Sequence, residues 1–216
     1  MFIGHFALGL AAKRAAPRLS LAALFGAAQL ADMLWPVLLL AGLEQVRIDP
    51  GNTRLTPLDF VSYPYSHSLL LLVAWGLAFG WILRRRDPRA LVVIAALVVS
   101  HWFLDFLTHR PDMPLYPRGP KFGLGLWNWP AATFAIELPM FVAGIAIYFH
   151  VTRARDRVGM AATFMLLALL LVIYVGDAMS GAPPPSPTAI AWVGLAGAVL
   201  ITAWAGWADR HREARA

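Results

Sequence analysis

The stretch ALVVIAALVVSHWFLDFLTH, residues 90–109, decides the fold because it is an apolar segment that ends in a motif of ionisable residues. A helix of about 20 residues is long enough to cross a bilayer. His101, Asp105 and His109 are spaced four apart, and a step of four turns an α-helix by only about 40°, so the three side chains share one face. Ionisable groups inside a spanning helix are costly and usually face a protein or water interior. The segment therefore predicts a membrane helix that contributes to a buried metal or proton-transfer site.

The composition extends this interpretation to the whole chain. Of its 216 residues, 59% are hydrophobic and 14% are charged, and the mean hydropathy of +0.63 is far above that of soluble proteins. No positively charged segment precedes the first apolar residues and no small-residue cleavage site follows them, so we expect no removed signal peptide. The chain has no cysteine, so any metal must take His and carboxylate ligands, which suit zinc, manganese or iron.

Charged or Pro-rich breaks separate six apolar segments of near-spanning length, at residues 19–43, 67–83, 90–109, 130–150, 159–179 and 188–208. A seventh segment, Met1–Ala12, is too short to cross alone, and we expect it to enter the membrane partway with protein around it. Pro36 predicts a kink after Trp35. The sequence thus predicts an all-α integral membrane protein, a single polytopic membrane domain over residues 1–216, with six transmembrane helices plus a short N-terminal membrane-embedded half-helix.

The basic residues predict the orientation of these spans. One set of alternate loops holds thirteen of the 18 basic residues: Lys13, Arg14, Arg18, Arg84, Arg85, Arg86, Arg89, Arg153, Arg155, Arg157, Arg210, Arg212 and Arg215. The other five are Arg47, Arg54, Arg110, Arg118 and Lys121. By the positive-inside rule the first set marks the cytoplasm, so the C-terminus is predicted to be cytoplasmic. The net charge of +6 is then a topology signal, and nucleic-acid binding is not expected.

In this topology, ionisable residues from five segments converge on the outer half of the membrane. His101 lies near mid-membrane and Asp105 about 6 Å further out. The full set expected there is His5, Asp32, His67, His101, Asp105 and Glu137.

Simpler explanations exist for single members of this set. A lone histidine can be hydrogen-bonded to a neighbouring carbonyl, as His5 could be, and Asp32 or Glu137 could be a neutral or paired structural carboxylate. His109 lies about 12 Å from His101 along a straight helix, so sharing one metal would strain both side chains. His109 could serve a second metal, act as an acid or base, or lie at the membrane surface.

Four short motifs support a more specific hypothesis: FIGHFALGL at residues 2–10, LADMLWP at 30–36, YSHSLL at 65–70 and HWFLDFLTH at 101–109. Over about the first half of the chain, their order resembles the bacterial inner-membrane "metal-dependent hydrolase" family related to YdjM. That family shows an N-terminal Gly-His, an acidic motif after the first hydrophobic segment, a Thr/Ser-His-Ser and a His-x-x-x-Asp.

The resemblance implies metal ligands and a location in the bacterial inner membrane. The implied ligands are His5, Asp32, His67, His101 and Asp105. A weak similarity of the family to zinc-dependent phospholipases C implies zinc and a hydrolase. The chain departs from the family in two places: LADM has a single acid where Pro-Asp-x-Asp is expected, and Ser62-Tyr63-Pro64 replaces a basic His-Arg.

The function expected from these residues is hydrolysis of a phospholipid or another lipid-linked ester at the outer half of the bilayer. A divalent metal with an open position would lower the pKa of water toward about 7. Asp32 or Glu137 could then act as general base and His109 could protonate the leaving oxygen. Arg110, Arg118 and Lys121 could hold an anionic phosphate, or could be ordinary loop charges.

Two alternatives from other classes remain open at this point. Intramembrane histidines and carboxylates also occur in metal-ion or proton-coupled transporters. The inner halves of the spans carry almost no ionisable groups, which favours the enzyme. A non-catalytic membrane scaffold would leave the polar cluster unexplained.

Overall fold

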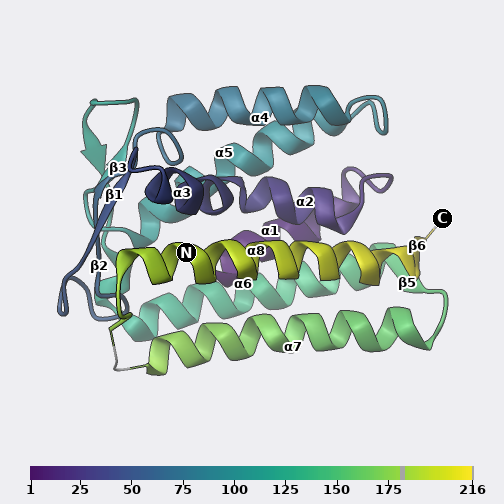
Figure 1. Ribbon diagram of the computed structural model, residues 1–216. Helices are drawn as coiled ribbons and strands as arrows, with labels where there is room; N and C mark the ends of the chain where they lie inside the picture. The colour runs from purple at the N-terminus through teal and green to yellow at the C-terminus, as the bar shows by residue number, and fades with distance from the viewer. Residues whose placement is uncertain (181–182, 216) are drawn as a thin grey trace.

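The computed structural model describes residues 1–180 and 183–215, and most of them are helical. Figure 1 shows the long helices running side by side, with the short α1 inside the bundle. The helices of the described residues are α1 (Ile3–Ala11), α2 (Leu21–Ala28), α3 (Leu30–Leu40), α4 (Leu69–Leu83), α5 (Ala90–Thr108), α6 (Pro130–Val151), α7 (Arg157–Met179) and α8 (Pro187–Arg210). Two short 3₁₀ turns, Ala12–Arg14 and Leu126–Asn128, join them.

Four of these helices, α5 to α8, are long and apolar enough to cross a membrane, and α2 with α3 makes a fifth if the bent pair is one span. Helix α4 has 15 residues, which gives a length of about 22 Å, short of the ~30 Å hydrocarbon core. The structure therefore supports an integral membrane protein with four or five candidate spans. The arrangement of six spans stays a prediction.

The segment predicted as one span at residues 19–43 is broken. Helices α2 and α3 meet at an angle of 60°, and the break lies at Gln29, whose backbone leaves the helical region (φ −106°, ψ 13°). Helix α3 continues through Pro36, so the main bend is not after Trp35. The break frees the carbonyl of Ala28, which accepts a hydrogen bond from His101 Nδ1 at 2.8 Å. A residue of α5, far away in sequence, thus supplies the hydrogen bond that the bend leaves open at Ala28.

Helix α1 is enclosed by protein, as expected for a short apolar segment. Ile3, Phe6 and Leu10 are buried, and the helix packs mainly on α6 and α2. Gly144 of α6 permits this close approach, because a Cβ atom there would lie 2.5 Å from the carbonyl oxygen of Ala7. How deeply α1 enters the membrane stays a prediction.

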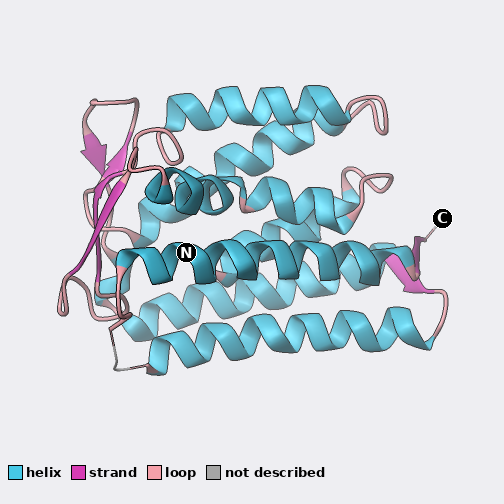
Figure 2. Ribbon diagram, viewed as in Figure 1, coloured by secondary structure: helices cyan, strands magenta, loops and turns pink. Residues whose placement is uncertain are grey.

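The loops contain short strands, which an all-α prediction did not include. They form three antiparallel pairs: β1 (Gln45–Ile48) with β2 (Leu58–Ser62), β3 (Met113–Pro114) with β4 (Lys121–Phe122), and β5 (Thr152–Ala154) with β6 (Arg212–Ala214). Figure 2 shows β5–β6 at one end of the bundle and the other two pairs at the opposite end. Strands β3 to β6 have only two or three residues, too few for an alternating pattern to reveal. Strand β1 alternates polar and apolar residues over QVRI, a signal that the sequence analysis missed.

The loops with most of the basic residues gather at the end that carries β5–β6 (Figure 1). A buried ion pair joins the chain there: Lys13 Nζ lies 2.7 Å from Asp209 Oδ2. Asp209 also accepts hydrogen bonds from the Tyr148 hydroxyl at 2.9 Å and from the Leu21 amide at 3.0 Å. One carboxylate of α8 therefore ties together α6, the start of α2 and the turn after α1.

Candidate metal centre

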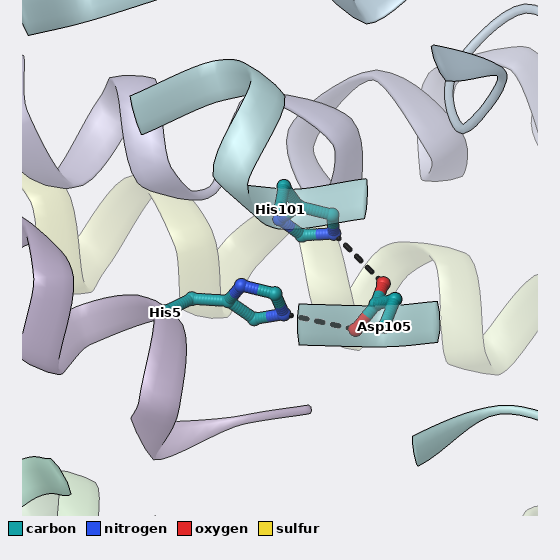
Figure 3. A group of neighbouring side chains, drawn as sticks. All are labelled: His5, His101 and Asp105. Atoms are coloured by element: carbon teal, nitrogen blue, oxygen red, sulfur yellow. Dashed lines mark hydrogen bonds and ion pairs between the residues drawn. The ribbon is translucent and has the colours of Figure 1, made fainter. Parts of the chain in front are cut away.

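The His101–Asp105 motif of α5 is joined in space by His5 of α1. His101 Nε2 lies 3.0 Å from Asp105 Oδ2, and His5 Nε2 lies 3.0 Å from Asp105 Oδ1. Figure 3 shows the two imidazoles next to each other on one side of the carboxylate, each pointing a nitrogen toward one of its oxygens. The rings of His5 and His101 are stacked with centroids 3.8 Å apart. These three buried side chains form one group whose ligand atoms could hold a metal ion.

A second group shares His101 and adds side chains from two other segments. Asp32 Oδ1 of α3 lies 3.5 Å from His67 Nε2 and 3.7 Å from His101 Nε2. His67 Nε2, just before α4, is also 3.9 Å from Asp105 Oδ2. N–H···O hydrogen bonds are about 2.7–3.2 Å long, whereas neighbouring ligands of a tetrahedral zinc ion lie about 3.3 Å apart. These separations therefore fit ligands around an ion better than direct hydrogen bonds.

His101 makes a hydrogen bond through Nδ1, which leaves its other ring nitrogen, Nε2, available to bind a metal. Its Nδ1–H donates to the Ala28 carbonyl, so the lone pair is on Nε2, which faces Asp105. Among the described residues, buried His101 Nε2 and His5 Nδ1 have no hydrogen-bond partner. The Nε2 lone pair and Asp105 Oδ2 thus face each other at 3.0 Å without hydrogen-bond geometry. A cation between these two acceptors would satisfy both, which supports a site that receives an ion.

His67 is oriented by a hydrogen-bonded chain that the sequence did not reveal. Its Nδ1–H donates to Ser66 Oγ at 2.7 Å, and the Ser66 hydroxyl donates to Glu44 Oε2 at 2.6 Å. Glu44 is itself fixed by the backbone amides of Tyr65 and Ser66. Such partners fix the tautomer and orientation of a metal-binding imidazole. The adjacency of Ser66 and His67 was a usable signal, but nothing near Glu44 in the sequence pointed to the site.

Removing the Ser66 hydroxyl is expected to weaken metal binding. In Ser66→Ala, His67 Nδ1 loses its acceptor, and losses of this kind typically lower metal affinity by about 10–100-fold. The measurement is competition for zinc against a chelating dye. Ser68→Ala is the matched control, because Ser68 is equally buried and its Oγ has no partner among the described residues. Equal affinity of the two variants would show that Ser66 does not orient a ligand.

His109 lies beside the same carboxylate and has its own acidic partner. Its Nε2 is 3.8 Å from Asp105 Oδ2, and its Nδ1 is 3.0 Å from Asp112 Oδ1. Tyr63 donates to the same Asp112 oxygen at 2.6 Å. Burial, together with the charge of Asp112, raises the pKa of Tyr63 well above its usual value, so Tyr63 stays a donor. The spacing of three between His109 and Asp112 was a signal that sequence analysis missed.

Glu137 lies outside both ligand groups and holds the start of α1. Its Oε2 accepts the amides of Phe2 at 3.0 Å and Gly4 at 3.2 Å. The amino group of Met1 contacts Asp105 Oδ1 and lies 3.0 Å from Thr108 Oγ1. Thus the backbone nitrogen of Met1 also lies against the Asp105 carboxylate, on the side that faces His5.

The three basic residues expected to hold a phosphate do not form one cluster. Arg110 forms an ion pair with Asp59, which Arg47 also contacts at 2.6 Å. Arg118 and Lys121 instead line a surface cavity of about 260 Å³. The Lys121 ammonium there donates to the Val61 carbonyl at 3.0 Å.

The fold and the site together define an integral membrane protein whose helices enclose a cluster of histidines and aspartates able to hold a metal ion. Residues 1–180 match the family described as YdjM inner membrane protein, and the chain belongs to that family. The match extends through α7, well beyond the motifs of the first half. No curated protein and no solved structure matches the chain.

Proposed function

We propose that this inner membrane protein is a metal-dependent hydrolase that acts on a phospholipid or another lipid-linked ester in the outer half of the bilayer. The observation that carries the proposal is the convergence of Nε2 atoms from His5, His67 and His101 on the carboxylates of Asp32 and Asp105. In this proposal the basic end of the bundle is cytoplasmic. The end of α5 that carries Asp105 then lies toward the outer surface.

The proposed ligands are those five side chains, and zinc suits their nitrogen and oxygen donors. A divalent metal bound there would acidify water and polarise the ester bond. The protein contributes the geometry: Ala28, Ser66 and Glu44 fix the tautomers of His101 and His67. Glu137 acts as a positioning residue, because it anchors the helix that carries His5.

Asp32 and His109 are proposed to move the protons. The Asp32 side chain is 42% exposed, whereas those of His5, His67, His101, Asp105 and His109 are at most 4% exposed. Asp32 is therefore the side chain best placed to meet substrate. Its Oδ1 faces His67 and His101 on the ligand side, and its other oxygen, Oδ2, would take a proton from attacking water. As the ester bond breaks, His109 would donate a proton from Nε2 to the leaving oxygen. Asp112 stabilises the charged imidazolium that this step requires.

The test of the proposal is turnover of vesicles made of phosphatidylglycerol and phosphatidylethanolamine, with products identified by mass spectrometry. We expect hydrolysis that stops when the metal is removed by a chelator and returns with zinc. His109→Gln is expected to keep its metal and to lose about 10²–10⁴-fold in rate, the usual contribution of a general acid. His150→Gln is the control, since His150 is exposed at the far end of α6.

Two results would contradict the proposal. One is a purified wild-type protein that contains no divalent metal. The other is hydrolysis that continues unchanged after chelation. Loss of metal in His109→Gln would instead show that His109 is a ligand, and would refute its role as the acid.

A further inference from the structure

An apolar groove lies between α3 and α8, beside the metal centre. Its volume is about 390 Å³, within the roughly 300–1,000 Å³ of small-molecule sites. Phe2 and Phe6 close one side, and α8 lines it from Ile190 to Thr202. That part of α8 is about 18 Å long, more than half the thickness of a bilayer's hydrocarbon core. The groove therefore has the length and lining of a site for a hydrocarbon chain.

The wall of the groove formed by residues 29–36 carries polar groups, and it reaches the metal centre. Asp32 lines the groove and also belongs to the second ligand group. Gln29 and Trp35 line the same cavity and are only 6% and 7% exposed. Within the described part of the chain, Gln29 Oε1 and Trp35 Nε1 have no hydrogen-bond partner. A buried donor and a buried acceptor without partners are costly. A polar group bound in the groove could give both atoms a hydrogen-bond partner.

The groove continues along α8 into a second cavity of about 620 Å³. The two cavities share Phe2, Ile173, Ile190, Val193 and Gly194, and the second also reaches Asp177 and Ser180. Val193 is 73% exposed and the neighbouring Trp192 59% exposed. In a spanning helix, large exposed apolar side chains face the bilayer. A lipid could therefore enter from the side, between α3 and α8, without passing through water.

We propose that this groove binds the hydrocarbon chain of a membrane lipid, with the polar linkage of the lipid beside Gln29, Asp32 and Trp35. This deepens the proposed function, and its catalytic meaning rests on that function: the substrate would enter from the bilayer, and its ester would meet the metal centre at Asp32. Charge and lining argue against a water-soluble substrate in the groove, since Asp32 is the only ionisable residue that lines this cavity among the described residues.

The glycines provide a matched pair of variants. A Cβ atom at Gly197 would meet no atom within 4 Å, and Gly197 lines the groove. Leucine at this position should fill the groove without disturbing the packing of α8. Gly176 of α7 is also free of neighbours within 4 Å, but it lines neither cavity. Gly176→Leu therefore controls for adding a leucine to a membrane helix.

The experiment uses the full chain in vesicles of phosphatidylethanolamine and phosphatidylglycerol that contain a phosphatidylglycerol with a photoreactive diazirine in its acyl chain. After illumination, crosslinked peptides are mapped by mass spectrometry. We expect the label to concentrate on α3 and α8 in the wild type. Gly197→Leu should lower this labelling by about tenfold or more, because the added side chain displaces several methylene groups. Gly176→Leu should leave it unchanged.

The metal content of each variant is measured in parallel, which separates this inference from the proposed function. Label spread evenly over the exposed faces of α4, α7 and α8, or unchanged labelling in Gly197→Leu, would refute lipid binding in the groove. This conclusion would hold even if the protein binds metal. The label could instead concentrate on α3 and α8 and disappear in Gly197→Leu, while the protein contains no metal. That result would support lipid binding in the groove and refute the proposed metal-dependent hydrolysis.

Discussion

Replacing His101 by alanine is expected to remove most of the bound metal. His101 belongs to both three-residue ligand groups, so its removal leaves only two ligands in each. Losing even an outer partner of a ligand typically costs about 10–100-fold in affinity, and losing the ligand itself should cost at least about 100-fold. Asp105→Ala should have the same effect, because its two oxygens face His5 and His101. Elemental analysis of purified protein measures both variants.

His150→Ala is the control for this experiment, because it removes an exposed imidazole that is far from the centre. A wild-type metal content in both His101→Ala and Asp105→Ala would mean that the pair is structural. Folding must be checked in parallel by the thermal unfolding of each variant, since a buried carboxylate that has lost its partner also destabilises a protein.

Breaking the ion pair at the opposite end of the bundle is expected to cause the largest loss of stability. In Asp209→Ala, the buried Lys13 ammonium loses its carboxylate, and Tyr148 and Leu21 lose their acceptor. Removing one partner of a buried pair typically costs about 3–5 kcal/mol. The free energy of unfolding, measured by denaturant titration in mixed micelles, should fall by that amount.

The exposed pair of Arg153 and Glu213 provides the comparison. Their side chains are 68% and 35% exposed and lie 2.6 Å apart, and such surface pairs contribute about 0–1 kcal/mol. Glu213→Gln should therefore change the free energy of unfolding much less than Asp209→Ala. Similar losses in the two variants would show that burial of the Lys13–Asp209 pair does not determine its contribution.

The sequence predicted the elements whose signals are local. The segments expected at residues 90–109 and 130–150 match α5 (Ala90–Thr108) and α6 (Pro130–Val151) closely. The reason is that the breaks on either side of a long apolar run define where the helix begins and ends. The His101–Asp105 pair was visible for a similar reason, since a spacing of four puts two side chains on one helical face. The structure brings His5, Asp32 and His67 to the same place, although whether all five bind metal remains a proposal.

The sequence could not predict features that depend on partners far along the chain. The break at Gln29 is accompanied by a hydrogen bond from His101, the orientation of His67 by a chain to Glu44, and the position of α1 by hydrogen bonds to Glu137. Each is a single hydrogen-bonded contact between separate segments, and no periodicity in the sequence encodes it. Glu137 illustrates the limit: a buried acid was recognised, but its two amide partners, which are seen only in the structure, point to a positioning role.

The break between α2 and α3 also predicts an order of membrane insertion. Residues 21–40 leave the ribosome well before α5 is synthesised, and at that stage neither the Asp32 carboxylate nor the freed Ala28 carbonyl has its partner from α5. Each group alone is costly in hydrocarbon, by roughly a few kcal/mol. We therefore expect the α2–α3 segment to stay beside the insertion machinery until His101 arrives. Release into the bilayer would then follow the docking of α5, so the same contacts that build the site also time the assembly of the bundle.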